Sequence, residues 1–433
     1  MNSNNTKRMT IKKTIPIAIS LTLISLFINS CNNSRSRSNQ NIDGNQVVAT
    51  TIKEDVAALP IPSKPTINTY IENSASMDGY VKGVTAFEQS VYSYLSDIKI
   101  KDITDSLNLF YINTKPIPYG SDIADFIEKL EPTSFKQRGG NRGTTDISNL
   151  LKSVLESSDD NKVSILISDF IFSPGKKDAE QYLVNQQIGI KGSVANFLKI
   201  HPNHGVVIYH LESQFDGYFY DKYDKPFKYK GNRPYYIWII GHKQHLKTIT
   251  TQCPAKEFKG GGVKNIFSIL KGNIPVNYAI KYGSGNFRPS RTDTKHSIVK
   301  ARKDTKGDDR KLRFSINVDY SNLLCGSEYL LKDDNYILSD RDYDIDIVEN
   351  KSDAGFTHLL KLSSDIVKPS TLAIKLKSEI PDWVEDVSDD DGIGINKDNE
   401  DETFGFEDLI TGLYEGFTVD GDEYTTIKIN INK

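Results

Sequence analysis

The chain has 433 residues, a hydrophobic fraction of 37% and a formal net charge of −3. This length exceeds what a single hydrophobic core usually organises, so we expect two domains of ordinary size. The chain has only 3 cysteines, too few for a disulfide-stapled scaffold. The composition is typical of a globular protein with polar tails.

The first 30 residues are typical of a targeting signal. A basic stretch precedes an uncharged apolar run over residues 15–30, which is short for a membrane-spanning helix. The run ends with "INS" before Cys31, and this pattern resembles the lipobox of bacterial lipoproteins, whose cysteine becomes the lipid-modified first residue. The alternative is an uncleaved N-terminal anchor. Both interpretations place the folded part outside the cytoplasm and against a membrane.

Residues 31–64 are predicted to be a flexible tether. The segment from Asn32 to Gln46 is rich in Asn and Ser and has almost no apolar side chains to pack. The residues after Cys31 lack the acidic cluster that would resemble a surface-export tag. We therefore expect an outer-membrane lipoprotein on the periplasmic face rather than the cell surface.

Residues 65–253 show strands alternating with helices, which predicts an α/β domain with a doubly wound, mainly parallel sheet. The predicted strands cover residues 66–73, 106–112, 162–170 and 205–211. The predicted helices cover residues 83–98, 121–130, 144–157 and 183–200, the third capped by Thr144 or Thr145. Aromatic segments on either side of "DKYDKP" predict a hairpin within residues 215–241, and a helix follows to residue 252.

The remaining chain is predicted to be a linker over residues 254–276 and a β-rich domain over residues 277–433. Short alternating segments indicate antiparallel strands, arranged as a sandwich. In "DRDYDIDIV" the acids alternate with apolar residues, which predicts a half-buried strand. A late helix over residues 402–417 and a final strand over residues 424–432 complete this domain.

Polar side chains follow two of the predicted strands of the α/β domain. Glu72, Ser74 and Ser76 come directly after the first strand, and Asp169 lies at the end of the strand in "ILISDF". Thr145 lies in "GGNRGTTD", a glycine-rich loop that leads into a helix. Because ligands of open α/β sheets bind at the carboxyl ends of strands, we expect these residues to form a site.

The segments "ENSAS", "GTTD" and "LISDF" together resemble the metal-ion-dependent adhesion site of von Willebrand factor type A domains, over roughly residues 66–252. The family pattern has Asp at position 72 and Gly at position 170, where this chain has Glu and Phe. The resemblance implies Mg²⁺ or Mn²⁺ ligated by hydroxyls, with the two carboxylates holding ligated waters. It also implies that the site captures an acidic residue of a partner and performs no reaction. We expect a protein partner, with a glycan as the less favoured alternative.

Two alternatives use the same loops differently. A degenerate fold would keep the shape and bind no ion, and Glu72, with its extra methylene, favours that alternative. An extracytoplasmic hydrolase would use Ser74 or Ser76 as nucleophile. However, neither serine lies in a G-x-S-x-G motif, and no histidine has a spacing that nominates it as the base.

Other motifs receive simpler interpretations. The histidine pairs 201/204 and 242/245 could bind zinc, but we expect them to face solvent. The acidic segment 389–402 fails the EF-hand pattern at both ends and is expected to bind Ca²⁺ loosely or to stay disordered. The basic segment 286–313 is interpreted as a solvated loop, so we expect no nucleic-acid partner. Whether Cys253 and Cys325 pair is left open.

Overall fold

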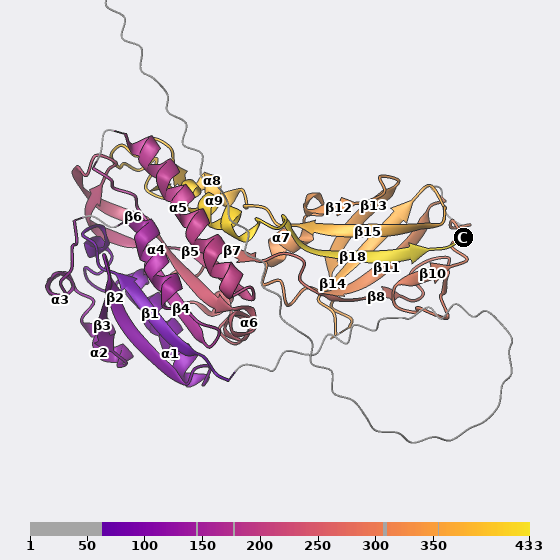
Figure 1. Cartoon of the computed structure of the whole chain (residues 1–433), viewed down its shortest axis with the longest axis horizontal. Coiled ribbons are helices and arrows are strands. Elements are labelled where there is room, and N and C mark those ends of the chain that lie inside the picture. Colours follow the sequence, from indigo (N-terminus) through magenta and orange to yellow (C-terminus); the bar gives the residue numbers. More distant parts are fainter. Residues whose placement is uncertain (1–62, 144–145, 176–177, 306–309, 354) are drawn as a thin grey trace, which may run out of the picture. The chain divides into compact units, whose positions relative to one another are not determined.

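The computed structural model describes residues 63–143, 146–175, 178–305, 310–353 and 355–433 (Figure 1). These residues belong to one compact unit. The predicted signal, Cys31, almost all of the predicted tether and Thr145 lie outside the described residues. Within the described ranges, no helix has the length and apolar character needed to cross a membrane.

A seven-stranded sheet organises the first part of this unit, in the order β3-β2-β1-β4-β6-β5-β7. Its strands are β1 (Thr66–Glu72), β2 (Ser106–Ile112), β3 (Pro116–Gly120), β4 (Lys162–Ser168), β5 (His204–Tyr220), β6 (Pro226–His242) and β7 (Asn265–Leu270). Only β1 with β2 and β1 with β4 pair in parallel, and every other pair is antiparallel. The α/β class is confirmed, but the sheet is mixed, so the prediction of a mainly parallel sheet is wrong.

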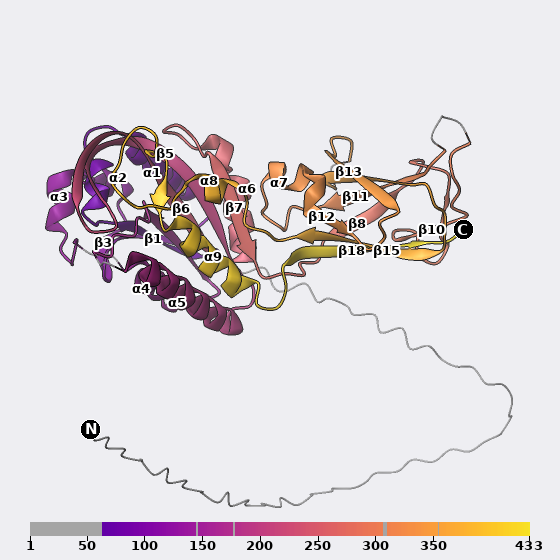
Figure 2. The same ribbon diagram turned by 90° about the horizontal axis from the view of Figure 1, so that it is seen from above.

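Helices cover both faces of this sheet (Figure 2). They are α1 (Ala86–Ile100), α2 (Ile123–Glu128), α3 (Pro132–Gln137), α4 (Ile147–Glu156), α5 (Ala179–Ile200), α6 (Lys243–Gln252) and α9 (Phe406–Phe417). One apolar core joins α1, α2 and α6 to one face, and another joins α4, α5 and α9 to the opposite face. Within β4, Val163 and Ile165 belong to the first core and Leu166 to the second, as the period of two in a strand requires.

Two segments lie elsewhere than the sequence predicted. The predicted linker contains β7, which pairs antiparallel with β5 as an edge strand of the large sheet. The late helix α9 was assigned to the β-rich domain, but it packs on α5, where Gly412 and Gly416 allow the two helices to approach closely. Both segments bury apolar side chains against partners distant in the sequence, and local periodicity carries no information about such partners.

The helix α4 begins later than predicted. Its cap is Asp146, whose carboxylate accepts the Asn149 N–H, and not Thr144 or Thr145.

Two further sheets form the β-rich part and share an apolar core, as a sandwich does. One sheet contains β13 (Tyr343–Glu349), β14 (His358–Ser364), β11 (Leu312–Asp319) and β8 (Asn277–Lys281). The other contains β12 (Tyr336–Leu338), β15 (Ser370–Lys377), β18 (Glu423–Ile431), β10 (Ser297–Val299) and β9 (Arg288–Pro289). The half-buried strand predicted from "DRDYDIDIV" is β13, where Tyr343 and Ile347 are buried and Asp344 and Asp346 are exposed. Short elements complete the unit: α7 (Ser327–Leu331), α8 (Trp383–Asp386), β16 (Ser388–Asp389), β17 (Thr403–Phe404), η1 (Ser76–Gly79), η2 (Ala255–Glu257) and η3 (Asp333–Asn335).

The histidine pairs and the cysteines also differ from simple surface positions. His204, His242 and His245 are buried, so the prediction of solvent-facing histidines is wrong for these three. The cause is their position: His204 begins β5, His242 ends β6 as its register partner, and His245 lies on the buried face of α6. Cys253 and Cys325 are free thiols, and burial raises their pKa to about 11 and about 12.

Candidate functional site

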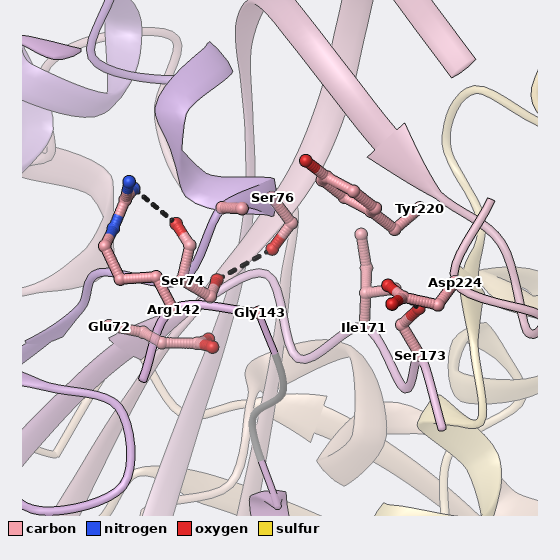
Figure 3. A pocket seen from close by; sticks show the side chains of 10 residues that line it. Glu72, Ser74, Ser76, Arg142, Gly143, Ile171, Ser173, Tyr220 and Asp224 are labelled. Atoms are coloured by element: carbon pink, nitrogen blue, oxygen red, sulfur yellow. Dashed lines mark hydrogen bonds between the residues drawn. The ribbon is translucent and has the colours of Figure 1, made fainter. Parts of the chain in front are cut away.

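The site lies where β1 and β4 end, at their carboxyl edge, and Figure 3 shows its side chains. β1 is buried along nearly its whole length and terminates at Glu72. The chain then turns into η1, which begins at Ser76, and the Ala75 N–H donates to the Arg142 carbonyl at 3.0 Å. This bond holds the loop that precedes α4 against the loop that follows β1. Two of the three predicted segments are therefore neighbours.

The hydroxyls of Ser74 and Ser76 face each other across 2.8 Å (Figure 3). Glu72, Ser74 and Ser76 line a cavity of about 30 Å³. A cavity holds a water molecule when it offers at least roughly 10–15 Å³, so this one has room for an ion or a few waters but not for an organic substrate. The arrangement is that of a small polar binding site.

A hydrogen-bond relay fixes the carboxylate of Glu72. The Ser168 hydroxyl donates to Glu72 Oε2, and the Phe170 N–H donates to Ser168 Oγ at 2.8 Å. Glu72 is 3% exposed, so this oriented contact replaces the water that a carboxylate would otherwise bind. The relay thus connects the end of β1 to the turn after β4.

That turn contains backbone in the left-handed region. Phe170 has φ +51°, a conformation that costs a residue with a side chain roughly 1–2 kcal/mol. Its ring stacks on Trp238 with the ring centres 4.5 Å apart, and this buried contact offsets part of the cost. The position therefore has the backbone that glycine adopts most easily.

Asp169 lies near the hydroxyl of Ser76 and is 1% exposed. Its Oδ1 accepts the Ile171 N–H at 3.3 Å, while its Oδ2 has no hydrogen-bond partner among the described residues. Burial raises the pKa of this carboxyl, opposed by the nearby Ser76 hydroxyl, the Ile171 N–H and the charge of Arg233. A buried acceptor of this kind is a position where an ion or an ordered water completes the bonding.

Arg142 brings a positive charge to the cavity wall. Its Nε donates to the Asn73 carbonyl at 2.7 Å and its Nη2 to the Ser74 carbonyl at 3.0 Å. The guanidinium also pairs with Asp78, which lies 3.6 Å from Lys136 as well. Asp78 therefore neutralises much of the arginine charge, and the bonds to the carbonyls hold the loop that carries Ser74.

Seven lining residues were not among the predicted site residues, and four of these have polar or charged side chains: Arg142, Ser173, Tyr220 and Asp224. The Ser173 hydroxyl donates to the Asp221 carbonyl at 2.8 Å, which ties the turn after β4 to the tip of the β5–β6 hairpin. Asp224 lies at that tip with φ +61°. The signal for it was the turn sequence "DKYDKP", but nothing local indicates that the hairpin folds back over the end of β4.

The acidic segment 389–402 is ordered against this hairpin. Buried Arg233 of β6 donates to the carbonyls of Asn399 and Glu400, at 3.4 and 2.9 Å. The Tyr229 hydroxyl donates to the Glu400 carboxylate. The alternative that this segment stays disordered is therefore wrong, because an arginine far away in the sequence fixes the loop, while loose Ca²⁺ binding stays a prediction.

Three of the five predicted metal-site residues, Glu72, Ser74 and Ser76, line one cavity, and Asp169 is buried beside them. The fifth, Thr145, lies outside the described residues, between the cavity residue Gly143 and the helix cap Asp146 in sequence. Comparison of the chain with protein-family models, with curated proteins and with solved structures finds no match.

Proposed function

We propose that the chain is a membrane-anchored lipoprotein whose α/β part captures an acidic residue of a protein partner through a divalent cation at the site of Ser74 and Ser76. The observation that carries the proposal is the hydroxyl pair beside the buried carboxylate of Asp169. Lipidation at Cys31 and an outer-membrane location, with the periplasmic face favoured, are part of the same proposal.

The separation of the hydroxyls supports Mg²⁺ or Mn²⁺. Mg²⁺–oxygen distances of about 2.0–2.1 Å place neighbouring ligands of an octahedron about 2.9 Å apart. The two hydroxyl oxygens are 2.8 Å apart, whereas Ca²⁺, with its longer bonds, would separate them further. Ser74 and Ser76 would ligate directly, and Glu72 and Asp169 would hold ligated waters.

The charges at the site support capture of a carboxylate. Neutral hydroxyls as direct ligands leave a bound dication able to attract an acidic group from a partner. Arg142, though paired with Asp78, adds a positive charge to the same wall. A carboxylate at the mouth of the cavity would thus meet a cation and a guanidinium.

The backbone at Phe170 supports the resemblance to von Willebrand factor type A domains. The family pattern has glycine at this position, and Phe170 adopts the left-handed conformation that glycine adopts most easily. The turn after β4 thus has the backbone that the family pattern would require at this position, although the residue is Phe.

Calorimetric titration of the full chain with Mg²⁺ and Mn²⁺ tests the cation site. The decisive variant is S74A/S76A, and the matched control is S290A/T292A, which removes another pair of hydroxyls two residues apart, 3.1 Å from each other. We expect saturable binding that the first variant abolishes and the control retains. Absence of binding in every protein would leave the metal-free alternative, and turnover that depends on one serine without a divalent ion would favour the hydrolase.

Capture of an acidic group is tested with a short peptide that has one aspartate and with the same peptide carrying asparagine. We expect only the aspartate peptide to bind, only with Mg²⁺ present, and not to S74A/S76A. Equal binding of both peptides would reject the carboxylate as the captured group.

A further inference from the structure

A second cluster of polar side chains lies at the opposite edge of the large sheet, where β5 begins and β6 ends. Asp160, His201 and His204 come together there, and one ligand atom of each lies within 4.8 Å of the other two. His201 ends α5, His204 opens β5, and Asp160 lies in the turn before β4. Four of the 7 histidines of the chain lie in this region, because the ring of His242 lies 6.1 Å from that of His204 and the ring of His245 lies 6.0 Å from that of His242.

One histidine of the cluster is oriented as a metal ligand would be. His204 Nε2 lies 3.2 Å from the Asp159 carbonyl. A carbonyl can only accept, so this contact assigns the proton of the neutral ring to Nε2 and leaves Nδ1 as a bare lone pair. A backbone carbonyl that fixes the tautomer in this way is the usual outer partner of a metal-bound histidine.

The bare nitrogen faces another acceptor. His204 Nδ1 has no hydrogen-bond partner among the described residues, and the side chain is 0% exposed. It lies 3.7 Å from Asp160 Oδ1, which also accepts from His201 Nδ1 at 2.8 Å. Two acceptors this close are unfavourable in a buried position unless a proton or a metal cation lies between them.

We propose that Asp160, His201 and His204 bind a divalent transition metal of the Zn²⁺ class. Metal–ligand distances of about 2.0–2.1 Å place the ligands of a tetrahedron about 3.3–3.4 Å apart, and the two contacts of Asp160, at 2.8 and 3.7 Å, lie on either side of this value. His201 would bind the metal through Nδ1 as the neutral tautomer that has its ring proton on Nε2. Asp160 is 72% exposed, so the fourth position is open to water.

The donor atoms separate this site from the hydroxyl site. Imidazole nitrogens favour zinc and related metals, whereas an all-oxygen set favours Mg²⁺. Excess Mg²⁺ is therefore expected not to compete for the histidine site.

Calorimetry of the full chain with Zn²⁺, in the presence of excess Mg²⁺, tests the proposal, and the visible absorption of tetrahedral Co²⁺ provides a second readout. We expect one Zn²⁺ per chain. H201Q and D160N should lose at least about 100-fold in Zn²⁺ affinity, because removing a residue that only orients a metal ligand already lowers the metal affinity by about 10–100-fold. The matched control is H296Q, which removes the histidine of another Asp–His pair, 3.2 Å apart and without a third ligand.

Both decisive substitutions affect partly or largely exposed side chains, so the variants are expected to fold, and a thermal melt checks this. S74A/S76A should retain Zn²⁺ binding, which separates failure of this site from failure of the hydroxyl site. No saturable Zn²⁺ binding by the wild-type chain, or equal affinities of H201Q and H296Q, would overturn the proposal and leave the cluster as a hydrogen-bonded Asp–His pair.

Discussion

Replacement of Asp169 by Asn tests the buried carboxylate of the hydroxyl site. The side chain is 1% exposed, its Oδ2 lacks a hydrogen-bond partner among the described residues, and burial raises the pKa of the carboxyl. The pKa of Asp169 is raised although the charge of Arg233 acts to lower it. Without a bound cation, the surroundings therefore favour the protonated carboxyl more than water does. Asparagine keeps the shape of the side chain and removes the charge.

The magnitude follows from the buried charge. Each pKa unit of upward shift corresponds to about 1.4 kcal/mol, so D169N, which removes the charge and keeps a polar side chain, should raise the free energy of unfolding by on the order of 1 kcal/mol at neutral pH without divalent ions. Because the pKa of the carboxyl is higher in the folded state, the wild-type chain loses stability as the pH rises above the ordinary value of about 3.9. The advantage of D169N should therefore vanish below that pH, where the carboxyl of Asp169 is protonated in both states.

Urea unfolding followed by circular dichroism, in EDTA and in Mg²⁺, measures this difference. At an Mg²⁺ concentration 100 times its Kd, the wild-type chain should gain about 2.7 kcal/mol and D169N less, so the order of the two stabilities reverses. The control is D319N: Asp319 Oδ1 accepts the Ser321 N–H in the same type of turn, at 3.0 Å, but the side chain is partly exposed. A D169N chain less stable than wild type in EDTA would refute the reasoning, because Asp169 would then already be satisfied.

Two further predictions concern buried groups near the large sheet. Phe170 has φ +51°, which glycine adopts more easily than alanine. F170G should therefore be more stable than F170A by about 1 kcal/mol in urea unfolding, although it removes more of the side chain. The reverse order would contradict the left-handed backbone. His210 is stacked on Trp383, and burial, with a smaller contribution from the charge of Lys264, lowers its pKa to about 4. Because the unfolded chain binds the proton more readily, the free energy of unfolding should fall by up to about 3 kcal/mol as the pH drops from about 6.5 to 4, and H210F should lose less over this range. Equal decreases of the urea midpoints of the wild-type chain and H210F would contradict the lowered pKa of His210.

The sequence could predict the strands and helices whose periodicity is local. β1, α1, β2, β4 and α5 all lie within the predicted segments or overlap them closely. Their apolar spacing is set by the face that each element buries, and that face can be inferred without knowing the partner.

Pairing partners could not be predicted in the same way. β6 lies between β4 and β5 because the long hairpin returns its second strand into the middle of the sheet. Its apolar run from Tyr235 to Ile240 is buried on both faces, and such a run is indistinguishable by pattern from that of a buried parallel strand. The mixed sheet therefore arises from a pairing choice that leaves no trace in the alternation of residues.

The site was predictable to a similar extent. Ser74, Ser76 and Asp169 follow strands that the pattern identified, and neighbouring parallel strands bring their carboxyl ends together. Asp224 reaches the cavity only because the hairpin folds over the end of β4, and Arg142 does so through bonds to backbone carbonyls. Contributions of this kind depend on tertiary structure and have no local signature.

The two proposed cation sites are physically independent because β4 separates them. Asp160 precedes this strand and Asp169 follows it, and seven residues of strand span about 23 Å at roughly 3.3 Å per residue. This length is far too great for the two sites to share a ligand, so removing the ligands of one site leaves the coordination of the other intact. The sites also differ in donor chemistry, oxygen at one edge and nitrogen with oxygen at the other, so each should take its own metal without competition. Loss of one site should consequently leave the affinity of the other unchanged, which is why a substitution at one edge serves as a control for the opposite edge.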